Sequence, residues 1–350
     1  MIIFSHIFHS IQVSKLLILT GTRKPQFLNY QARKIEVVDL QNPLNSCSLP
    51  EEFPVGLMRA VGGFTKDGPL LCGGYNIDTD SESNACFILN NGKFSETDVS
   101  LQKGRDRATA VVLPNGKLWI QGGAQLKSSE IVSLQGSEYG MELAKPVNGH
   151  CSMLINSTTA LITGGNNGGI HKVTAETYFV DIDNWISSKG PDMTRGRRSH
   201  GCAVFWYNNH TYALVAGGMF ASSTEILDLD SPILEWTKGK LPKSAPGIPN
   251  ISISIIDIKI NSRGLKLILG PELPVSMKDF SLVSTTQGLL AVGGYDDTYK
   301  RNKDEILKLK CQDDEDLSTC IWEEYSKKLD VARFHHVVIP LPASYEICNN

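Results

Sequence analysis

Three short stretches of the sequence carry residue types that often do chemistry. Gly122-Gly123 lies between an apolar run and a polar interval, as in loops that cradle a phosphate. His335-His336 could ligate a metal, and Ser199-His200 places a nucleophile beside a base. Each of these chemistries requires further residues in a fixed arrangement. The presence or absence of those residues indicates whether a stretch is a functional site or a structural feature.

The glycine pair recurs along the chain, as a structural turn does and a single phosphate loop does not. No copy continues into Gly-Lys-Ser/Thr, and none opens a helical pattern. Successive copies are 53, 49, 42, 53 and 76 residues apart, near the period of a four-stranded propeller blade. The sequence therefore predicts that these glycines, including those of the wide turn 164–169, shape turns. The six copies end at Gly21, Gly74, Gly123, Gly165, Gly218 and Gly294.

The histidine and serine pairs lack the partners that catalysis needs. Adjacent residues of a strand point to opposite faces, so His335 and His336 cannot bind one ion together. No other Cys, His or carboxylate cluster shows ligand spacing. Ser199 lies outside the glycine pattern of a nucleophile elbow. We expect one of the two histidines at a channel and the other in the core, and we expect no catalytic residue, metal or cofactor.

Each repeat predicts four antiparallel strands, and these strands must position any site. An apolar run joined to the Gly-Gly strand by a tight turn supplies the first two, as at Asn115-Gly116, a pair that favours type I′ hairpins. A third strand follows each glycine pair and has an acidic residue near its start. The fourth often begins with an aromatic residue. The aromatic residues are Trp185, Trp236 and Trp322, with Phe94 and Tyr139 as equivalents.

This pattern resembles the kelch repeat, and the resemblance covers almost the whole chain. It is carried by the six glycine turns, the downstream aromatics, and an Arg or His that opens the first strand; the first turn departs from it with Thr20-Gly21. The resemblance implies an all-β, kelch-type β-propeller. Copper oxidases and sialic-acid-processing propellers share this architecture, but we cannot place their catalytic sets on these residues, and architecture alone implies no enzyme. The opening residues are Arg59, Arg107, His150, His200 and Arg333.

The two ends of the chain predict the blade count. Residues 1–14 do not read as an inner strand, whereas 332–342 read as an inner strand with no successor. We expect six blades, with the C-terminal strand completing the first one and removing its exposed edge. The long interval before Gly294 predicts an inserted hairpin over 239–279; a seventh, degenerate blade is the alternative. The propeller would span 15–350, after a short segment 1–14 that resembles a signal-peptide remnant.

The composition excludes two classes of function. The 350 residues carry a net charge of −3, which argues against nucleic acid as an obligate partner. No apolar run reaches the roughly 18 residues that would span a bilayer. We expect a monomer.

The eight cysteines permit four disulfides and favour an oxidising compartment. One predicted pair flanks the acidic loop 313–316, one joins matching positions of neighbouring strands, and one fastens the C-terminus to the first blade. The other two occupy equivalent inner-strand positions in neighbouring repeats, so we expect them to be unpaired core residues. In this order the pairs are Cys311–Cys320, Cys72–Cys86 and Cys47–Cys348, and the unpaired residues are Cys151 and Cys202.

Three Asn-X-Ser/Thr sequences, at Asn156, Asn209 and Asn250, suit a secreted chain. Chance alone gives about as many in a chain of this composition. Together with the cysteines, they favour secretion over the alternative of a cytoplasmic location.

Strand direction places the binding face. Loops from the second to the third strand emerge on the same side as the loops that join consecutive blades. Arginine and tyrosine are frequent at binding hot spots, and arginine favours carboxylates. We therefore expect a non-catalytic propeller that binds a protein or peptide, with an acidic partner favoured, through this side. The candidate partner-binding residues are Arg59, Tyr75, Arg107, Asn166, Asn167, Arg198, Tyr295 and Arg333.

Two alternatives remain open at this point. The arginines could pair with blade carboxylates such as Glu130, Glu176 and Glu225 and only hold the fold together. The protein could also be a carbohydrate-binding or carbohydrate-processing propeller, which exposed aromatics and paired carboxylates around one channel mouth would favour. A ring of Arg, His and Asn would favour a peptide.

Overall fold

The computed structural model describes residues 13–22, 33–168, 172–207, 209–219, 221–238, 271–312 and 319–348. Three stretches named in the sequence analysis lie wholly or partly outside these ranges. They are the acidic loop 313–316, residues 1–12 of the N-terminal segment and residues 239–270 of the predicted insertion. Strand β1 (Val13–Leu19) includes the last two residues assigned to the N-terminal segment. Residues 271–279 of the predicted insertion contain strand β23 (Met277–Lys278).

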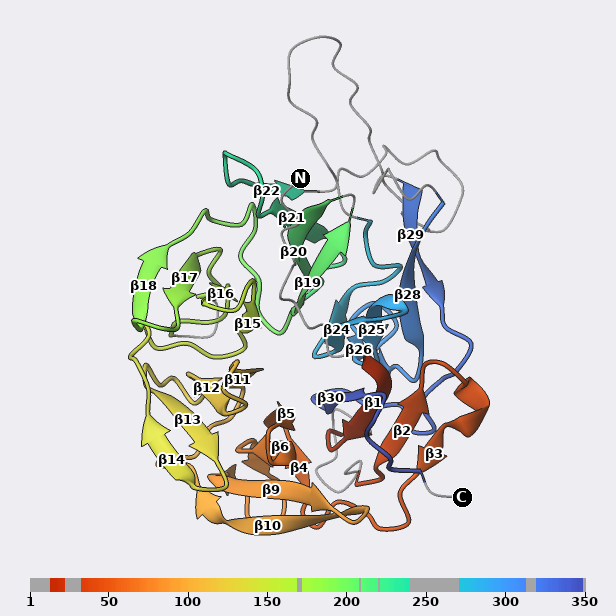
Figure 1. Cartoon of the computed structure of the whole chain (residues 1–350). Coiled ribbons are helices and arrows are strands. Elements are labelled where there is room, and N and C mark those ends of the chain that lie inside the picture. The colour runs from red at the N-terminus through yellow and green to blue at the C-terminus, as the bar shows by residue number, and fades with distance from the viewer. Residues whose placement is uncertain are drawn as a thin grey trace, which may run out of the picture.

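The elements named in the described ranges are β-strands and one 3-10 turn, η1 (Pro43–Asn45). Six four-stranded antiparallel sheets are arranged in a ring (Figure 1), and two three-stranded sheets accompany them. No helix in the described part of the chain has the length and hydropathy needed to cross a bilayer.

We number the four-stranded sheets 1 to 6 in chain order. Sheet 1 contains β30 (Val337–Pro342), β1, β2 (Glu36–Asp39) and β3 (Cys47–Ser48). Sheet 2 contains β5 (Val61–Thr65), β6 (Gly68–Cys72), β9 (Ala85–Asn90) and β10 (Lys93–Ser100). Sheet 3 contains β11 (Thr109–Val112), β12 (Leu118–Gln121), β13 (Ser129–Ser133) and β14 (Gly136–Tyr139).

Sheet 4 contains β15 (Cys151–Leu154), β16 (Thr159–Thr163), β17 (Thr177–Asp181) and β18 (Ile186–Lys189). Sheet 5 contains β19 (Gly201–Tyr207), β20 (His210–Ala216), β21 (Thr224–Asp228) and β22 (Trp236–Lys238). Sheet 6 contains β24 (Ser281–Thr285), β25 (Gly288–Val292), β28 (Ile306–Cys311) and β29 (Cys320–Glu324). The small sheets join β4 (Leu57–Met58), β7 (Tyr75–Asn76) and β8 (Ser81–Glu82), and β23, β26 (Tyr295–Asp296) and β27 (Arg301–Asn302).

The first and last strands of the described chain lie side by side. Strand β30 pairs antiparallel with β1, with Leu17 opposite Ile339. An isolated bridge between Thr22 and Phe334 extends the pairing beyond the strand ends. The orphan C-terminal strand therefore lies in the sheet where its sequence predicts it.

The core lies between neighbouring sheets. Residues Leu16 to Leu19 of β1 are all fully buried, because a second strand is covered by a neighbouring sheet on both faces. One apolar cluster joins Leu17 of sheet 1 to Leu71 and Phe87 of sheet 2. This two-sided burial explains why the strands before each glycine pair are continuously apolar instead of alternating.

The glycine pairs have a packing role. A Cβ on Gly122 would lie 2.7 Å from the carbonyl oxygen of Val147 and 3.0 Å from the ring of His150, so the first glycine makes room for the next sheet. Gly123 has a φ of +77°, and a Cβ there would lie 2.8 Å from the backbone nitrogen of Ala108. The recurrence of the pair follows from this repeated close approach.

All eight cysteines form disulfides. Three bonds join the predicted pairs, Cys47–Cys348, Cys72–Cys86 and Cys311–Cys320. The expectation that Cys151 and Cys202 are unpaired was wrong, because the structure joins them. Equivalent positions of adjacent inner strands converge at the centre of the ring, which brings their Cα atoms to 6.1 Å, within the usual range for a disulfide.

Candidate binding face

Six equivalent residues, one before each inner strand, form what we call the hub ring. Each has a φ between 53° and 59°, a left-handed conformation that turns the chain into its strand. Backbone N–H groups link successive members: Gly149 donates to the oxygen of Arg107 at 2.9 Å, and Ser199 donates to that of Gly149 at 2.8 Å. Similar bonds run from Asp279 to Ser199 and from His335 to Asp279. The hub ring contains Arg59, Arg107, Gly149, Ser199, Asp279 and His335.

Two arginines of the hub ring share one carboxylate. Arg59 Nη1 lies 3.1 Å from Asp106 Oδ2, and Arg107 Nη1 lies 3.2 Å from the same oxygen. The side chain of Arg107 is 41% exposed, whereas that of Arg59 is 17% exposed. The guanidinium of Arg107 makes no other hydrogen bond to the described residues. Asp106 is therefore shared by two guanidinium groups, and that of Arg107 is the more exposed of the two.

A half-buried Asp–His pair lies next to Arg59 in the hub ring. His335 Nε2 lies 3.0 Å from Asp279 Oδ2, and the same nitrogen lies 3.4 Å from Arg59 Nε. Burial alone would raise the pKa of Asp279, but His335, Ser199 and Arg59 outweigh it and hold this pKa at about 2. Burial lowers the pKa of His335 by more than Asp279 raises it. At neutral pH Asp279 is thus a carboxylate whose Oδ2 lies beside the His335 imidazole.

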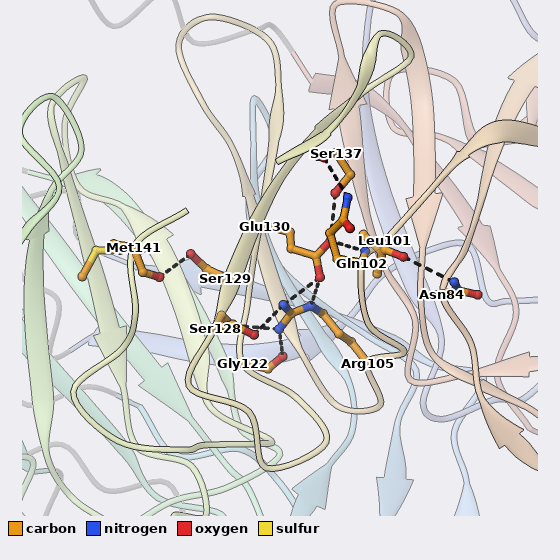
Figure 2. Close-up of polar contacts among 10 residues, drawn as sticks. All are labelled: Asn84, Leu101, Gln102, Arg105, Gly122, Ser128, Ser129, Glu130, Ser137 and Met141. Atoms are coloured by element: carbon orange, nitrogen blue, oxygen red, sulfur yellow. Dashed lines mark hydrogen bonds and ion pairs between the residues drawn. The ribbon is translucent and has the colours of Figure 1, made fainter. Parts of the chain in front are cut away.

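Three arginines two positions before the hub ring are structural. Arg105 is fully buried; its Nε and Nη2 bind Glu130 Oε1 at 3.0 and 2.8 Å, and its Nη1 donates to the Gly122 oxygen at 2.7 Å (Figure 2). Figure 2 also shows Glu130 accepting from the Gln102 backbone and Ser137. These contacts satisfy a charge that would be costly to bury alone.

Arg197 and Arg333 repeat this arrangement with Glu225 and Glu36. The placement of Arg333 among the partner-binding residues was therefore wrong: it is fully buried and cannot reach a partner. The carboxylates Glu130 and Glu225 do bind arginines, as the structural alternative proposed, but these are Arg105 and Arg197 and not the members of the hub ring.

The buried ion pairs alternate around the ring of sheets. The two positions compared are the residue two before each member of the hub ring and the residue of the third strand that faces it. Sheets 1, 3 and 5 carry Arg and Glu at these positions, whereas sheets 2, 4 and 6 carry apolar residues. In sheets 2 and 6 the loop after the glycine pair forms the small sheets, and in sheet 4 it forms the bridges of Asn166 to Asn148 and Val173. The apolar pairs are Leu57 with Phe87, Val147 with Tyr178, and Met277 with Leu307.

The four predicted loop residues lie in these loops, with different degrees of exposure. Tyr75 is half-buried and its hydroxyl donates to Asp80 at 2.6 Å. Tyr295 is buried against Phe334, with Lys278 over its ring at 5.0 Å. Asn166 is buried, and Asn167 is half-buried.

The remaining predicted residue, Arg198, flanks the hub ring. It is half-buried and its Nη2 contacts Met219 Sδ at 3.0 Å. Sequence reasoning missed Asp106, Ser199 and Asp279 as neighbours of the arginines. Their equivalent positions in the repeat could have revealed them. Asp279 directly precedes Phe280 in one repeat, just as Ser199 directly precedes His200 in another.

The inner strands enclose a cavity of about 1140 Å³. Its wall is mostly small or apolar, and His200 and His336 line it near the hub ring. The hairpin tips at its other end contribute Phe64, Phe205 and Trp206, and Trp206 is 65% exposed. Of the two paired histidines, His335 thus lies on the hub ring beside Asp279, and His336 is buried against Gly293.

Among the described residues, one group has donor atoms close enough to hold a metal: His210, Asp228 and Asp230, with atoms within 4.8 Å of one another. These atoms already bind within the protein. Asp228 accepts from His210 Nδ1 at 2.8 Å, and Asp230 accepts from the Thr211 backbone. We assign no metal to them.

Comparison with known proteins places the fold. No protein-family model and no curated protein sequence matches the chain. Among solved structures, the chain is similar to the structure of YjhT, with a TM-score of 0.63 and 12% identity over 88% of this chain and 97% of that one. The fold is propeller-like. At this identity the match describes the fold alone.

Proposed function

We propose that the six four-stranded sheets are the blades of one closed, six-bladed propeller of the kelch type. The pairing of β30 with β1 supports closure, because it covers the edge that β1 would otherwise expose. The repeated glycine pairs support the kelch assignment. The four disulfides support an oxidising compartment and hence secretion.

The function that we propose is non-catalytic binding of a protein or peptide through the face of the hub ring. The observation that carries it is Arg107, an exposed guanidinium whose single partner among the described residues, Asp106, is shared with Arg59. An arginine with unused donors fits a carboxylate, which it can bind through two N–H groups. We therefore infer an acidic partner. The exposed Tyr299, in the loop between β26 and β27 of the same face, would add apolar contact.

Binding measurements on surface variants test this proposal. A partner captured from native tissue would be titrated onto the wild type, Arg107→Ala, Arg198→Ala and Lys117→Ala. Lys117 is the matched control, because it forms an exposed ion pair with Glu138 at a hairpin on the opposite side. We expect Arg107→Ala to weaken binding roughly tenfold and Lys117→Ala to leave it unchanged. Unchanged binding by both arginine variants would place the site elsewhere.

A carbohydrate-directed propeller has less support. That alternative requires exposed aromatics and paired carboxylates around one mouth. Trp206 is exposed at the mouth opposite the hub ring, but Asp230 is the one carboxylate among the described residues that line the cavity.

A further inference from the structure

The hairpin between β19 and β20 presents an asparagine beside an exposed tryptophan. Tyr207 pairs with His210, and Asn209 lies in the turn between them. Asn209 is exposed and has a φ of 61°, a conformation that asparagine tolerates. Asn209-His210-Thr211 is also an acceptor sequence for N-glycosylation.

Trp206 and Thr211 lie directly opposite each other in the register of this hairpin. Residues opposite each other in an antiparallel pair project from the same face, so both side chains lie on one side of the turn. Trp206 is 65% exposed, although burial of an indole is favourable. Its apolar surface is thus available three residues before the acceptor asparagine and beside the acceptor threonine.

We propose that Asn209 is N-glycosylated and that its first N-acetylglucosamine packs against Trp206 and Thr211. The apolar C–H face of a pyranose can cover the indole, while the sugar hydroxyls stay in water. In the transfer, Asn209 Nδ2 bonds to C1 of a sugar carried on a lipid diphosphate. The bond between C1 and the diphosphate breaks, the lipid diphosphate leaves, and the proton of Nδ2 passes to a base of the transferase.

Asn156 provides an internal comparison. It also lies in an exposed hairpin turn, between β15 and β16, and belongs to the acceptor sequence Asn156-Ser157-Thr158. The residue three positions before it is Met153, which is buried. A sugar on Asn156 has no exposed aromatic at the corresponding position. The two sites separate the effect of the tryptophan from that of glycosylation itself.

The proposed sugar stands at the cavity mouth, which Trp206 and Asn209 both line. The hub ring lies at the other end of the inner strands, so the glycan leaves that face open. This inference requires passage through the secretory pathway but does not depend on the identity of the binding partner.

The test uses the full chain secreted from eukaryotic cells with a cleavable signal peptide. Peptide mass spectrometry measures occupancy at Asn209 and Asn156. Melting temperatures are then compared after the glycans are trimmed to their first sugar and after the glycans are removed completely. Both comparisons are made in the wild type and in Trp206→Ala. Complete removal converts the asparagine to aspartate, and this charge effect is common to both backgrounds.

We expect Asn209 to be occupied. We also expect trimming to one sugar to leave the melting temperature unchanged, and complete removal to lower it by roughly 1–3 °C in the wild type but not in Trp206→Ala. Trp206→Phe should retain part of the difference, and Asn156→Gln should not alter it. A secreted chain without sugar at Asn209, or an equal shift in both tryptophan backgrounds, would overturn the proposal.

Discussion

Arg197 and Glu225 form a fully buried ion pair in sheet 5, with Nη2 and Oε1 3.0 Å apart. The guanidinium also donates to the backbone oxygens of Gly217 and Ser223, at 2.7 Å each. In sheet 6 the same two positions hold Met277 and Leu307, which belong to one apolar cluster. The chain thus contains an ionic and an apolar solution to the same packing problem.

This comparison predicts a double-mutant result. Arg197→Met alone should cost about 3–5 kcal/mol in the free energy of unfolding, because it leaves the Glu225 carboxylate buried without its partner. Adding Glu225→Leu should recover most of that loss, since the pair then matches sheet 6. Urea unfolding measures both values. A double variant as unstable as the single one would show that the alternation of sheets is itself required.

The repeat pattern predicted much of the fold because it reflects contacts that recur in every sheet. The close approach of Gly122 to the next sheet is repeated around the ring, so a glycine appears at this position in five of the six copies, with Thr20 in the first. The unmatched strand near the C-terminus likewise predicted the pairing of β30 with β1. Both relationships leave a signal in the sequence: one is a repeated local pattern, and the other is a strand that has no partner within its own repeat.

The site was predicted less well because neighbouring arginines have opposite surroundings. Arg197 is buried and Arg198 is half-buried, although the two are adjacent. Which of the two arginines enters the core depends on Ser199, the residue that follows them and has a left-handed conformation. Serine is not a residue type that predicts this conformation. The Cys151–Cys202 disulfide was missed for a related reason, because the distance between adjacent inner strands is a property of the whole ring.

Acid should destabilise the protein through its buried histidines. Burial lowers the pKa of His150 to about 3, below its ordinary value of 6.5. The unfolded chain therefore takes up a proton as the pH falls below 6.5 while the folded chain does not, and stability is lost between pH 6.5 and about 3, by up to about 1.4 kcal/mol per pH unit.

His150→Phe tests this origin of acid sensitivity. Phe280 occupies the equivalent position in sheet 6, where its ring packs on Gly217 as that of His150 packs on Gly122. The variant should remain folded at pH 7 and lose less stability between pH 7 and 5 than the wild type. His210→Gln is the control, because Asp228 raises the pKa of this half-buried histidine and its contribution has the opposite sign. An unchanged pH dependence in His150→Phe would contradict the prediction.

The disulfide between Cys151 and Cys202 should stabilise the ring of sheets. It closes a loop with a sequence separation of 51 residues, which restricts the unfolded chain by up to about 4 kcal/mol. Replacing both cysteines with serine, which avoids a lone thiol, should lower the melting temperature of non-reduced protein. Mass spectrometry of a non-reduced digest tests the bond directly, and free thiols at both positions would show that it does not form.

Strand β30 should be essential for folding, and its contribution can be separated from that of the C-terminal disulfide. Deleting 330–350 removes the partner of β1, the buried Arg333 and the bond from Cys47 to Cys348. The matched control deletes 343–350 and replaces Cys47 with serine, which removes the disulfide but keeps β30. We expect the control to unfold cooperatively at a lower temperature, because closing so long a loop contributes up to about 5 kcal/mol. The longer deletion should aggregate, because β1 then exposes an unpaired apolar edge. A cooperative transition of the longer deletion at the temperature of the control would show that β30 is dispensable and that the ring of sheets does not depend on the pairing of its ends.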